Sequence, residues 1–203
     1  MRRLIDICAA SLVLVLLSPL FALISLLIVV DSWGNPFYGG WRAGKDGRRF
    51  RMWKFRSMVK NADRVGGAIT TPNDARITRV GGFLRKSKLD ELPQFFNLLL
   101  GDLTLVGPRP EDPGITEQYT AEQRQIFQVK PGITGPTQLR YTVIESEAIP
   151  DGEDAQQYYI DHILEQKVRL DLEYLQQRTF ASDVQVLSQT VLLMARALAH
   201  TES

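Results

Sequence analysis

Two adjacent carboxylates, Asp90 and Glu91, are the side chains of this sequence best suited to chemistry. Basic residues precede them, and the apolar residues that follow are spaced as on one face of a helix: Leu92, Phe95, Phe96 and Leu99. Because a helix N-terminus flanked by cations favours phosphate groups, the pair is suited to phosphoryl transfer. A purely structural role is the alternative, since Ser87 and Asp90 have a spacing that resembles a capping box, and acidic side chains stabilise a helix N-terminus.

The helix that carries this pair is bounded by a proline and a glycine. Pro93 is compatible with a helix only in the first turn, where its missing N–H leaves no hydrogen bond unmade. We therefore expect the helix to begin near Asp90 and to end before Gly101.

Cations that could bind phosphate are concentrated in residues 42–60, where Asp46 is the one acidic residue. The basic residues of this block are Arg42, Lys45, Arg48, Arg49, Arg51, Lys54, Arg56 and Lys60. The block is compatible either with a solvated strand surface or with a phosphate-binding surface.

A second candidate for phosphate binding is Arg109, which lies between two prolines that restrict its backbone. Its guanidinium fork matches the geometry of phosphate oxygens. An ordinary surface arginine in a proline-rich turn is the alternative. Lys130 opens another rigid turn rich in glycine and proline, at residues 130–136.

Few residues of this chain are soft metal ligands. The chain has one cysteine, Cys8, and two histidines, His162 and His200, which are far apart in the sequence. We therefore expect neither a disulfide within the chain nor a histidine-rich metal site. A metal would be a hard cation on carboxylate and phosphate oxygens, and Mg²⁺ is the natural choice. The net charge of +1 gives no overall field that favours nucleic acid.

The N-terminal region is long and apolar enough to enter a membrane. No charged residue lies between Ile7 and Val30, and a helix needs about 20 such residues to cross a hydrocarbon core. The run is longer than the apolar region of a signal peptide and lacks a small-x-small cleavage site, so we expect no cleavage. Ser18 and Pro19 at its midpoint favour a bend. From the residues alone we expect a kinked helix that spans the membrane. Because basic residues flank both ends, a hairpin that returns to the cytoplasmic face is the alternative.

The remaining elements are short and divided by glycine and proline. Asp46 and Gly47 predict the turn of a basic β-hairpin, whose second strand covers residues 49–55. Further elements are expected as a short basic helix or turn at 74–79 that Gly81-Gly82 interrupts, a loop at 61–73, a strand at 102–106, and helices at 121–128, 150–174 and 184–198. We expect the apolar stripe of the last helix to pack on the core, and a helix in the membrane interface is the alternative. The pattern predicts an α/β fold that is mostly helical, with a small β-hairpin.

Taken together, four segments resemble the bacterial sugar transferases, and more narrowly the small monotopic phosphoglycosyl transferases that start membrane glycan assembly. The segments are residues 53–58 (WKFRSM), 84–94 (LRKSKLDELPQ), 107–110 (GPRP) and 130–135 (KPGITG). The likeness covers nearly the whole chain. It implies transfer of a sugar phosphate from a UDP-sugar to a polyprenyl phosphate, usually undecaprenyl phosphate, with release of UMP and a requirement for Mg²⁺.

The resemblance also assigns roles to particular residues. It implies that Asp90 is the nucleophile, that it forms a covalent phosphosugar intermediate and binds the metal, and that Glu91 deprotonates or orients the incoming lipid phosphate. The expected ligands of the substrate and its phosphates are Arg42, Lys54, Arg56, Arg85, Arg109, Lys130 and Thr134.

The fold implied by the resemblance has two parts at the cytoplasmic face of the bacterial inner membrane. Residues 1–31 would form a re-entrant membrane helix hairpin bent at Ser18 and Pro19, and residues 32–203 a compact cytoplasmic catalytic domain partly sunk in the interface. A homodimer is a further expectation.

Some positions depart from the family pattern and leave the sugar open. Residues 136–139 read Pro-Thr-Gln-Leu where the family often has Trp-Ala-Gln-Val, and Gly39-Gly40-Trp41 precede Arg42 where Gln or Arg is frequent. Two other functions are compatible with the same residues. One is a non-catalytic, membrane-anchored module that binds anionic lipid, and the other is a sugar-nucleotide hydrolase.

Overall fold

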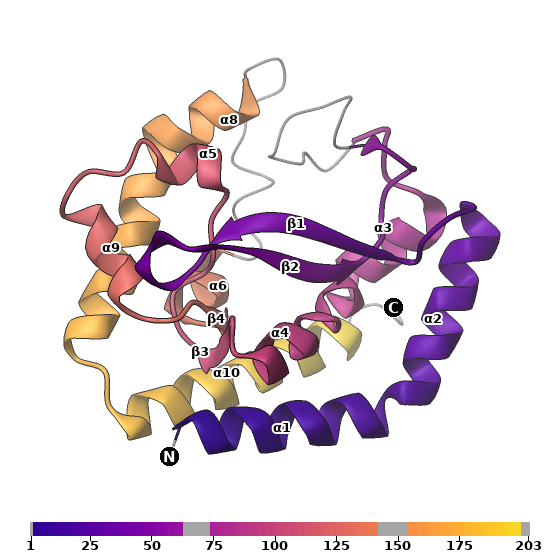
Figure 1. Ribbon diagram of the computed structural model, residues 1–203, viewed down its shortest axis with the longest axis horizontal. Coiled ribbons are helices and arrows are strands. Elements are labelled where there is room, and N and C mark those ends of the chain that lie inside the picture. The colour runs from indigo at the N-terminus through magenta and orange to yellow at the C-terminus, as the bar shows by residue number, and fades with distance from the viewer. Residues whose placement is uncertain (1, 63–73, 142–153, 200–203) are drawn as a thin grey trace.

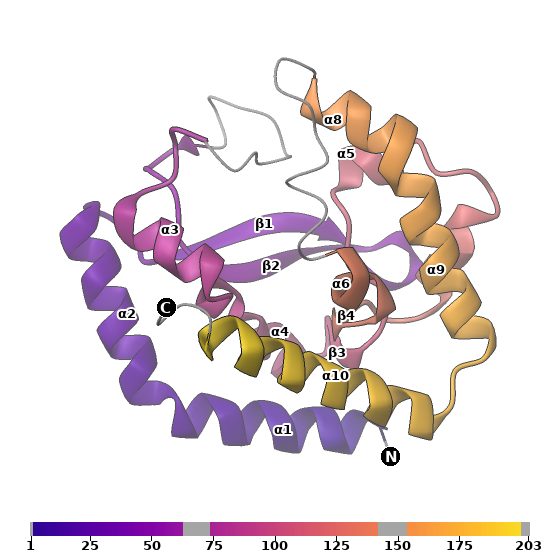
Figure 2. The same ribbon diagram turned by 180° about the vertical axis from the view of Figure 1, so that it is seen from behind.

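The computed structural model describes residues 2–62, 74–141 and 154–199. A β-hairpin lies across the middle of the molecule, with α2 at one end, α9 at the other, and α1 and α10 along the side below it (Figure 1 and Figure 2). The bounds of these elements are β1 Phe37–Ala43, β2 Arg49–Phe55, α1 Arg2–Leu16, α2 Ser18–Asp31, α9 Leu164–Gln176 and α10 Phe180–Ala199. The described residues are mostly helical with two two-stranded sheets, which confirms the mostly helical α/β class.

The predicted hairpin is confirmed, including its turn. Strands β1 and β2 are antiparallel, and Arg42 faces Phe50 across the pair. The chain reverses through a short 3₁₀ turn at Lys45–Gly47, where Asp46 has φ 57° and Gly47 has φ 71°. Asp and Gly tolerate this left-handed conformation better than other residues, which is why the dipeptide marks the turn.

The chain before the dyad has the predicted turn, at residues 75 and 76, but the helix that follows differs from the prediction. Helix α3 (Arg79–Lys86) begins after Thr78, whose side chain accepts a hydrogen bond from the backbone N–H of Gly81. Gly81 and Gly82 therefore do not interrupt a helix; they lie inside one. A side chain at Gly81 would collide with the carbonyl oxygen of Ser57, because its Cβ would lie 1.9 Å from that atom. Close packing of α3 against the chain after β2 thus explains the glycine.

A second, parallel strand pair supports the turn that contains Arg109. Strand β3 (Thr104–Val106) pairs with β4 (Gly132–Thr134). The strand predicted at 102–106 is confirmed, whereas its partner β4 lies in a segment that the sequence marked as a turn. Two strands distant in the sequence pair here because the glycines at 107 and 132 allow the two backbones to approach closely.

The other helices are short. They are α4 Gln94–Leu100, α5 Pro113–Thr116, α6 Pro136–Tyr141 and α8 Ala155–Tyr158, with a 3₁₀ helix at Gln123–Gln128 and a π-helical turn at Tyr159–Ile163 that joins α8 to α9. The helices expected at 121–128 and 150–174 are therefore present as this 3₁₀ helix and as the run from α8 to α9. Most of the predicted loop at 61–73 lies outside the described residues, as does the start of the helix expected at 150–174.

The N-terminal apolar run forms two helices with a bend of 62° between them, at the position of Ser18 and Pro19. The Ser18 hydroxyl donates to the carbonyl oxygen of Val15 at 2.9 Å, one of the groups that a proline leaves without a helical partner. Among the described residues no single helix is long and apolar enough to cross a membrane, although α1 and α2 together pass that test of length and composition.

Helices α1 and α2 are packed on the rest of the molecule. In α2 the side chains of Phe21, Ile24 and Ile28 share a core with Phe55 of β2 and Leu84 of α3. In the first turns of α1, polar contacts replace apolar ones. Asp6 is buried and accepts hydrogen bonds from the Thr104 hydroxyl and the Leu105 N–H, and Arg3 donates to the carbonyl oxygens of Leu98 and Leu99 at the end of α4.

Two residues of the apolar stripe predicted for the last helix do not pack on the core as expected. Val184 and Val191 of α10 are 49% and 67% exposed. The side of α10 that faces the molecule instead carries Asp183, Val186 and Thr190, of which Asp183 accepts from Tyr174 and Arg178. Polar contacts therefore contribute to holding this helix, while Val184 and Val191 of the stripe face outward and Leu187 is half-buried.

Candidate active site

The two carboxylates lie in a 3₁₀ turn, Leu89–Glu91, that precedes α4. The predicted end of the helix is confirmed, because Gly101 caps α4 with φ 93°. Its predicted start near Asp90 corresponds to this 3₁₀ turn, and the α-helix itself begins at Gln94. The chain enters the turn through Lys88, which has the left-handed values φ 59° and ψ 13°.

Glu91 is bound by two cations from different parts of the chain. Lys54 of β2 lies 2.8 Å from its Oε1 atom, and the Nη2 atom of Arg109 lies 3.3 Å from the same oxygen. Burial by itself would raise the pKa of Glu91, but the charges of Lys54 and Arg109 together outweigh it and hold the pKa well below its usual range. Glu91 is therefore a carboxylate at neutral pH.

Asp90 has a different environment. It is 5% exposed, and no described residue donates a hydrogen bond to its carboxylate. Burial raises the pKa of Asp90, against the opposing charge of Lys54. The two neighbouring carboxylates are thus unlike: Glu91 is neutralised by cations of the protein, whereas the oxygens of Asp90 are uncommitted.

The structural alternative for this pair, a capping box, is wrong. The Ser87 hydroxyl donates to the carbonyl oxygens of Phe83 and Leu84, so it closes the end of α3. No side chain caps the turn that holds Asp90. The carboxylates are therefore not explained by helix capping.

Asn97 of α4, which the sequence analysis did not select, holds the hairpin against the dyad. Its side chain is fully buried, accepts from the Trp53 N–H at 2.9 Å and donates to the Arg51 carbonyl oxygen at 2.7 Å. Because these contacts fix β2 on α4, they also fix Lys54 beside Glu91. Asn97 lies off the apolar face predicted for its helix, so the sequence carried no signal for its role.

Buried polar side chains on and next to α9 support the turn that contains Arg109. The N–H of Arg109 lies 3.4 Å from Oδ2 of Asp171, which is on α9. One turn earlier on α9, Lys167 donates to the Tyr159 hydroxyl at 2.7 Å, and this hydroxyl donates to the carboxylate of Glu111. We call Glu111, Tyr159, Lys167 and Asp171 the support cluster.

The carboxylates of the support cluster have opposite pKa shifts. For Glu111, burial would raise the pKa, but the charge of Lys167 and the Tyr159 hydroxyl lower it below its ordinary value. For Asp171, burial dominates and raises the pKa from 3.8 to about 6, although hydrogen bonds from Thr137 and the Arg109 N–H oppose it. Its Oδ1 atom is buried without a hydrogen-bond partner, which agrees with the direction of this shift.

The structure brings some of the expected phosphate ligands to the dyad. Lys54 and Arg109 contact Glu91, and the charge of Arg85, in the last turn of α3, lowers the pKa of Asp90. Arg42 lies farther along β1 and pairs with Asp112 at 3.3 Å. We call Lys54, Lys88, Asp90, Glu91 and Arg109 the dyad cluster.

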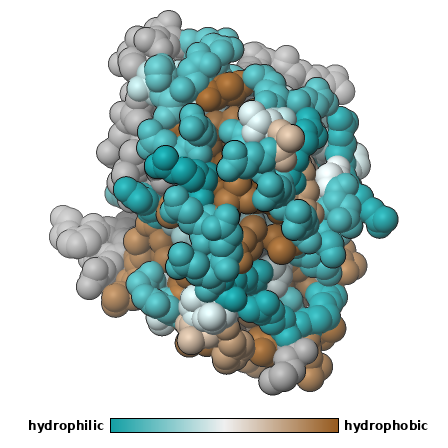
Figure 3. Space-filling view, turned by 90° about the vertical axis from the view of Figure 1, so that its left-hand side faces the viewer, coloured by the Kyte–Doolittle hydropathy of each residue, from teal (hydrophilic) through white to brown (hydrophobic). Residues whose placement is uncertain are grey.

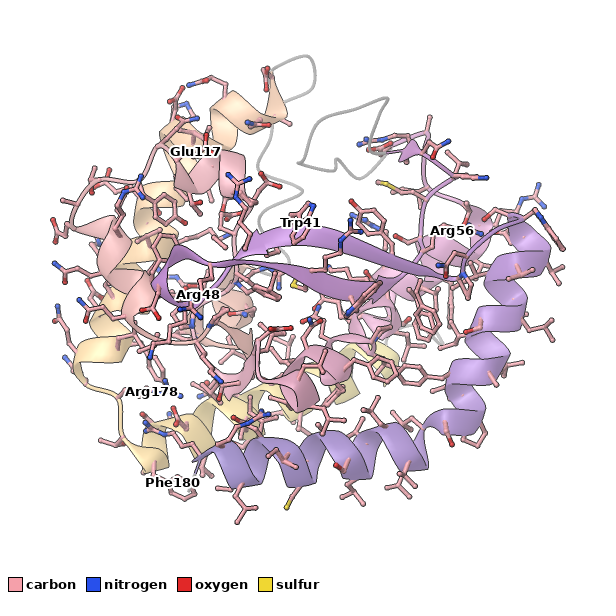
Figure 4. All side chains as sticks on the ribbon, viewed as in Figure 1. Trp41, Arg48, Arg56, Glu117, Arg178 and Phe180 are labelled. Atoms are coloured by element: carbon pink, nitrogen blue, oxygen red, sulfur yellow. The ribbon has the colours of Figure 1, made fainter. Side chains whose placement is uncertain are left out.

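Three other expected ligands have contacts elsewhere. Arg56 donates to the carbonyl oxygen of Ser32, and Figure 4 shows it beside the end of α2. Thr134 is buried, and its hydroxyl lies 2.7 Å from that of Thr190 on α10. The Nζ atom of Lys130 lies near Gly101, at the end of α4 opposite to the dyad. Substrate contacts of these residues remain predictions.

A magnesium ion would depend on the substrate for part of its ligands. Among residues 2–62, 74–141 and 154–199, no three His, Cys, Asp or Glu side chains lie together as a metal site. Mg²⁺ commonly binds one or two carboxylates together with substrate phosphates. The uncommitted carboxylate of Asp90 fits such a site.

Comparison with known proteins adds independent evidence. The chain is 37% identical over 94% of its length to the UDP-glucose:undecaprenyl-phosphate glucose-1-phosphate transferase of Escherichia coli K12, of which it spans 39%. A transferase of the same name from Caulobacter vibrioides is 33% identical over 94% of this chain and 68% of that protein. The UDP-N-acetylgalactosamine-undecaprenyl-phosphate N-acetylgalactosaminephosphotransferase of Aeromonas hydrophila is 43% identical over 68% of this chain and 33% of that protein.

The chain therefore spans about two fifths or less of two of these relatives. The model of the family described as bacterial sugar transferase matches residues 1–197, nearly the entire chain. The chain belongs to the bacterial sugar transferase family.

Proposed function

We propose that this chain transfers a sugar phosphate from a UDP-sugar to undecaprenyl phosphate and releases UMP, with Asp90 as the covalent nucleophile. The observation that carries the proposal is the contrast within the dyad. Asp90 is buried with uncommitted oxygens, while Glu91 beside it is neutralised by Lys54 and Arg109. The names of the relatives, which specify UDP-sugar donors and undecaprenyl phosphate, supply the substrate classes.

The reaction has two displacements at one phosphorus atom. In the first, a carboxylate oxygen of Asp90 attacks the phosphorus that carries the sugar, and the bond from this phosphorus to the bridging oxygen breaks. UMP leaves with the electron pair of that bond. In the second, an oxygen of undecaprenyl phosphate attacks the same phosphorus and releases the Asp90 carboxylate. A covalent intermediate divides one difficult transfer into two easier steps.

Glu91 acts by holding the charged side chains of Lys54 and Arg109 in position. Because its pKa is held well below the usual range, it is a weak base at neutral pH. Its carboxylate instead keeps Lys54 and Arg109 together next to the position of the phosphates, where positioned cations stabilise phosphoryl transfer. Mg²⁺, held by Asp90 and phosphate oxygens, would supply further neutralisation of the phosphate charge.

The second substrate is a lipid, and we propose that the enzyme lies on the cytoplasmic face of the inner membrane. Exposed apolar side chains on four helices support this: Leu12, Val15 and Leu16 of α1, Leu23, Leu26 and Val30 of α2, Leu100 of α4, and Val191 and Leu192 of α10. In Figure 3 hydrophobic residues gather along the lower edge, at the level of α1 in Figure 1. In this arrangement both ends of the bent pair α1–α2 face the cytoplasm.

Thiol labelling tests this topology. Single cysteines are added at either terminus in a Cys8→Ser background, and intact spheroplasts are treated with an impermeant maleimide. We expect labelling at neither position until the membrane is permeabilised. Labelling of one terminus from the periplasmic side would contradict the re-entrant arrangement.

The decisive experiment measures UMP release from a panel of UDP-sugars. Glucose and N-acetylgalactosamine donors come first because they are named for the relatives. Detergent-solubilised protein is assayed with and without undecaprenyl phosphate and Mg²⁺, and wild type is compared with Asp90→Asn. We expect release that requires lipid and metal, and that falls at least about 1,000-fold in a variant that stays folded.

Other outcomes identify the competing functions. Steady UMP release without lipid would indicate a sugar-nucleotide hydrolase. Full turnover in Asp90→Asn would exclude Asp90 as the nucleophile. No release from any donor by the folded wild-type protein would contradict the transferase and favour a non-catalytic module.

A further inference from the structure

Lys88 has a backbone conformation that few lysines adopt. Its φ of 59° and ψ of 13° lie in the left-handed region, which is unfavourable for a residue with a Cβ. Hydrogen bonds hold this conformation on both sides. The Lys88 N–H donates to the Arg85 carbonyl oxygen at 3.2 Å, and the Lys88 carbonyl oxygen accepts from the Glu91 N–H at 3.3 Å. The strained residue therefore joins the end of α3 directly to the turn that holds the dyad.

Glycine or asparagine would satisfy this backbone with less strain, so the lysine side chain needs another explanation. Strained backbone positions that persist in a fold are concentrated at functional sites. Lys88 is half-buried, and the described residues give its ammonium no hydrogen bond and no ion pair. The charges that act on it most strongly are those of Glu91, Arg109, Asp90 and Lys54.

The charge balance of the dyad cluster makes this lysine available for an anion. Lys54 and Arg109 are already paired with the same oxygen of Glu91. Lys88 adds a third cation to two carboxylates, and it is the one that no carboxylate in the described structure engages. A partly desolvated ammonium without a counter-ion is a binding group for phosphate oxygens.

We propose that Lys88 binds the diphosphate of the nucleotide-sugar donor. This inference rests on the proposed function, because it assigns a ligand to the same site. The ammonium of Lys88 compensates charge on the diphosphate while Asp90, two residues farther along the chain, attacks its sugar-bearing phosphorus. The left-handed backbone is retained because it brings a cation and the nucleophile to one side of the turn.

Binding of UDP without turnover tests the assignment. The affinity of the full-length, detergent-solubilised protein for UDP is measured by calorimetry in the presence of Mg²⁺, for wild type, Lys88→Gly and Lys88→Arg. Glycine accepts the left-handed backbone, so Lys88→Gly should remain folded. Lys86→Gln is the matched control, because Lys86 is exposed in the last turn of α3 and its loss removes the same charge nearby.

We expect Lys88→Gly to weaken UDP binding about 10- to 100-fold, as for the loss of a charge-assisted hydrogen bond. Lys88→Arg should recover part of this loss, and Lys86→Gln should bind UDP within about twofold of wild type. The KM for the UDP-sugar should rise in Lys88→Gly in parallel with the loss of UDP affinity.

Two results would overturn the assignment, and they differ in what they imply. UDP affinity of Lys88→Gly within twofold of wild type, with wild type binding UDP normally, would contradict the role of Lys88 and leave the transferase function intact. Absence of UDP binding and of turnover in the wild type itself would contradict both. Equal weakening in Lys88→Gly and Lys86→Gln would show a general charge effect and also contradict a specific contact.

Discussion

The dyad cluster and the support cluster meet at Arg109, whose side chain pairs with Glu91 and whose backbone N–H lies near Asp171. Both clusters contain lysine and carboxylate side chains, but their functions differ. The dyad cluster has three cations for two carboxylates, and the side chains of Lys54 and Arg109 are 23% and 31% exposed. The support cluster has two carboxylates for one lysine, and its Lys167, Tyr159 and Asp171 are at most 6% exposed. Excess positive charge open to solvent suits an anionic ligand, whereas a closed cluster with excess negative charge suits a scaffold.

The difference teaches that the role of a charged side chain depends on whether neighbouring groups of the protein already neutralise its charge. Glu111 faces Lys167 and the Tyr159 hydroxyl, so its charge is satisfied within the protein. Asp90 and Lys88 have no such partners among the described residues. Substitutions in the support cluster should therefore change mainly the stability of the fold, and substitutions in the dyad cluster should change mainly ligand binding or turnover.

The largest effect is expected for Lys167→Met. This change removes the charge that compensates Glu111 and the donor to the Tyr159 hydroxyl, and a buried charge left uncompensated destabilises a protein by about 3–5 kcal/mol. The urea midpoint of the detergent-solubilised protein measures it. The control is Arg49→Met, which removes an ion pair with Glu117 whose side chains are 62% and 69% exposed and should matter little. Equal urea midpoints for the two variants would contradict a structural role of the support cluster.

Asp171→Asn should instead raise the free energy of unfolding, by an amount that depends on pH. The folded protein holds the proton of Asp171 more tightly than the unfolded chain does, because its pKa is raised to about 6. Its contribution to stability is therefore fully present below about pH 4 and is lost as the pH rises through about 6. At pH 8 the uncharged asparagine should stabilise the protein by up to about 3 kcal/mol, and the gain should vanish by pH 4. Unfolding curves at several pH values measure this, and a gain that does not depend on pH would contradict it.

Glu91→Gln should separate binding from turnover. The amide no longer neutralises Lys54 and Arg109, so UDP should bind as tightly as in wild type or more tightly. Turnover should fall about 100-fold because the two cations lose their alignment. Initial rates and UDP calorimetry measure the two quantities. Glu117→Gln makes the same chemical change at an exposed position as a control, and a parallel loss of UDP affinity in Glu91→Gln would contradict the orienting role.

The smallest effect is expected for the stability of Lys88→Gly. Removing a Cβ from a left-handed position should raise the free energy of unfolding by about 1 kcal/mol, even though UDP binding weakens. The matched change Lys86→Gly lies in a helix and should lower the free energy of unfolding by about 0.5–1 kcal/mol. Urea midpoints compare them. A loss of stability in Lys88→Gly would show that the lysine serves the fold.

Local signals predicted much of the fold. The Asp46-Gly47 turn, the hairpin strands, the strand before Gly107 and the end of α4 at Gly101 all follow from short-range backbone preferences, which a sequence states directly. The same reasoning failed at Gly81, because the sequence does not distinguish a glycine needed for close packing from one that ends a helix. It also failed for Val184 and Val191 on α10, since periodicity shows that one face of a helix is apolar but not which way that face points.

The sequence by itself determined the family, the dyad and the supply of cations, because these depend on residue types and their spacing along the chain. The tertiary structure decided which cations serve the dyad. Lys54 and Arg109 reach Glu91, whereas Arg56 contacts Ser32 and Lys130 lies at the far end of α4. It also revealed the support cluster and the strained backbone of Lys88. The physical reason is that charge pairing and burial act across space between residues distant in the chain, and no local pattern records those distances.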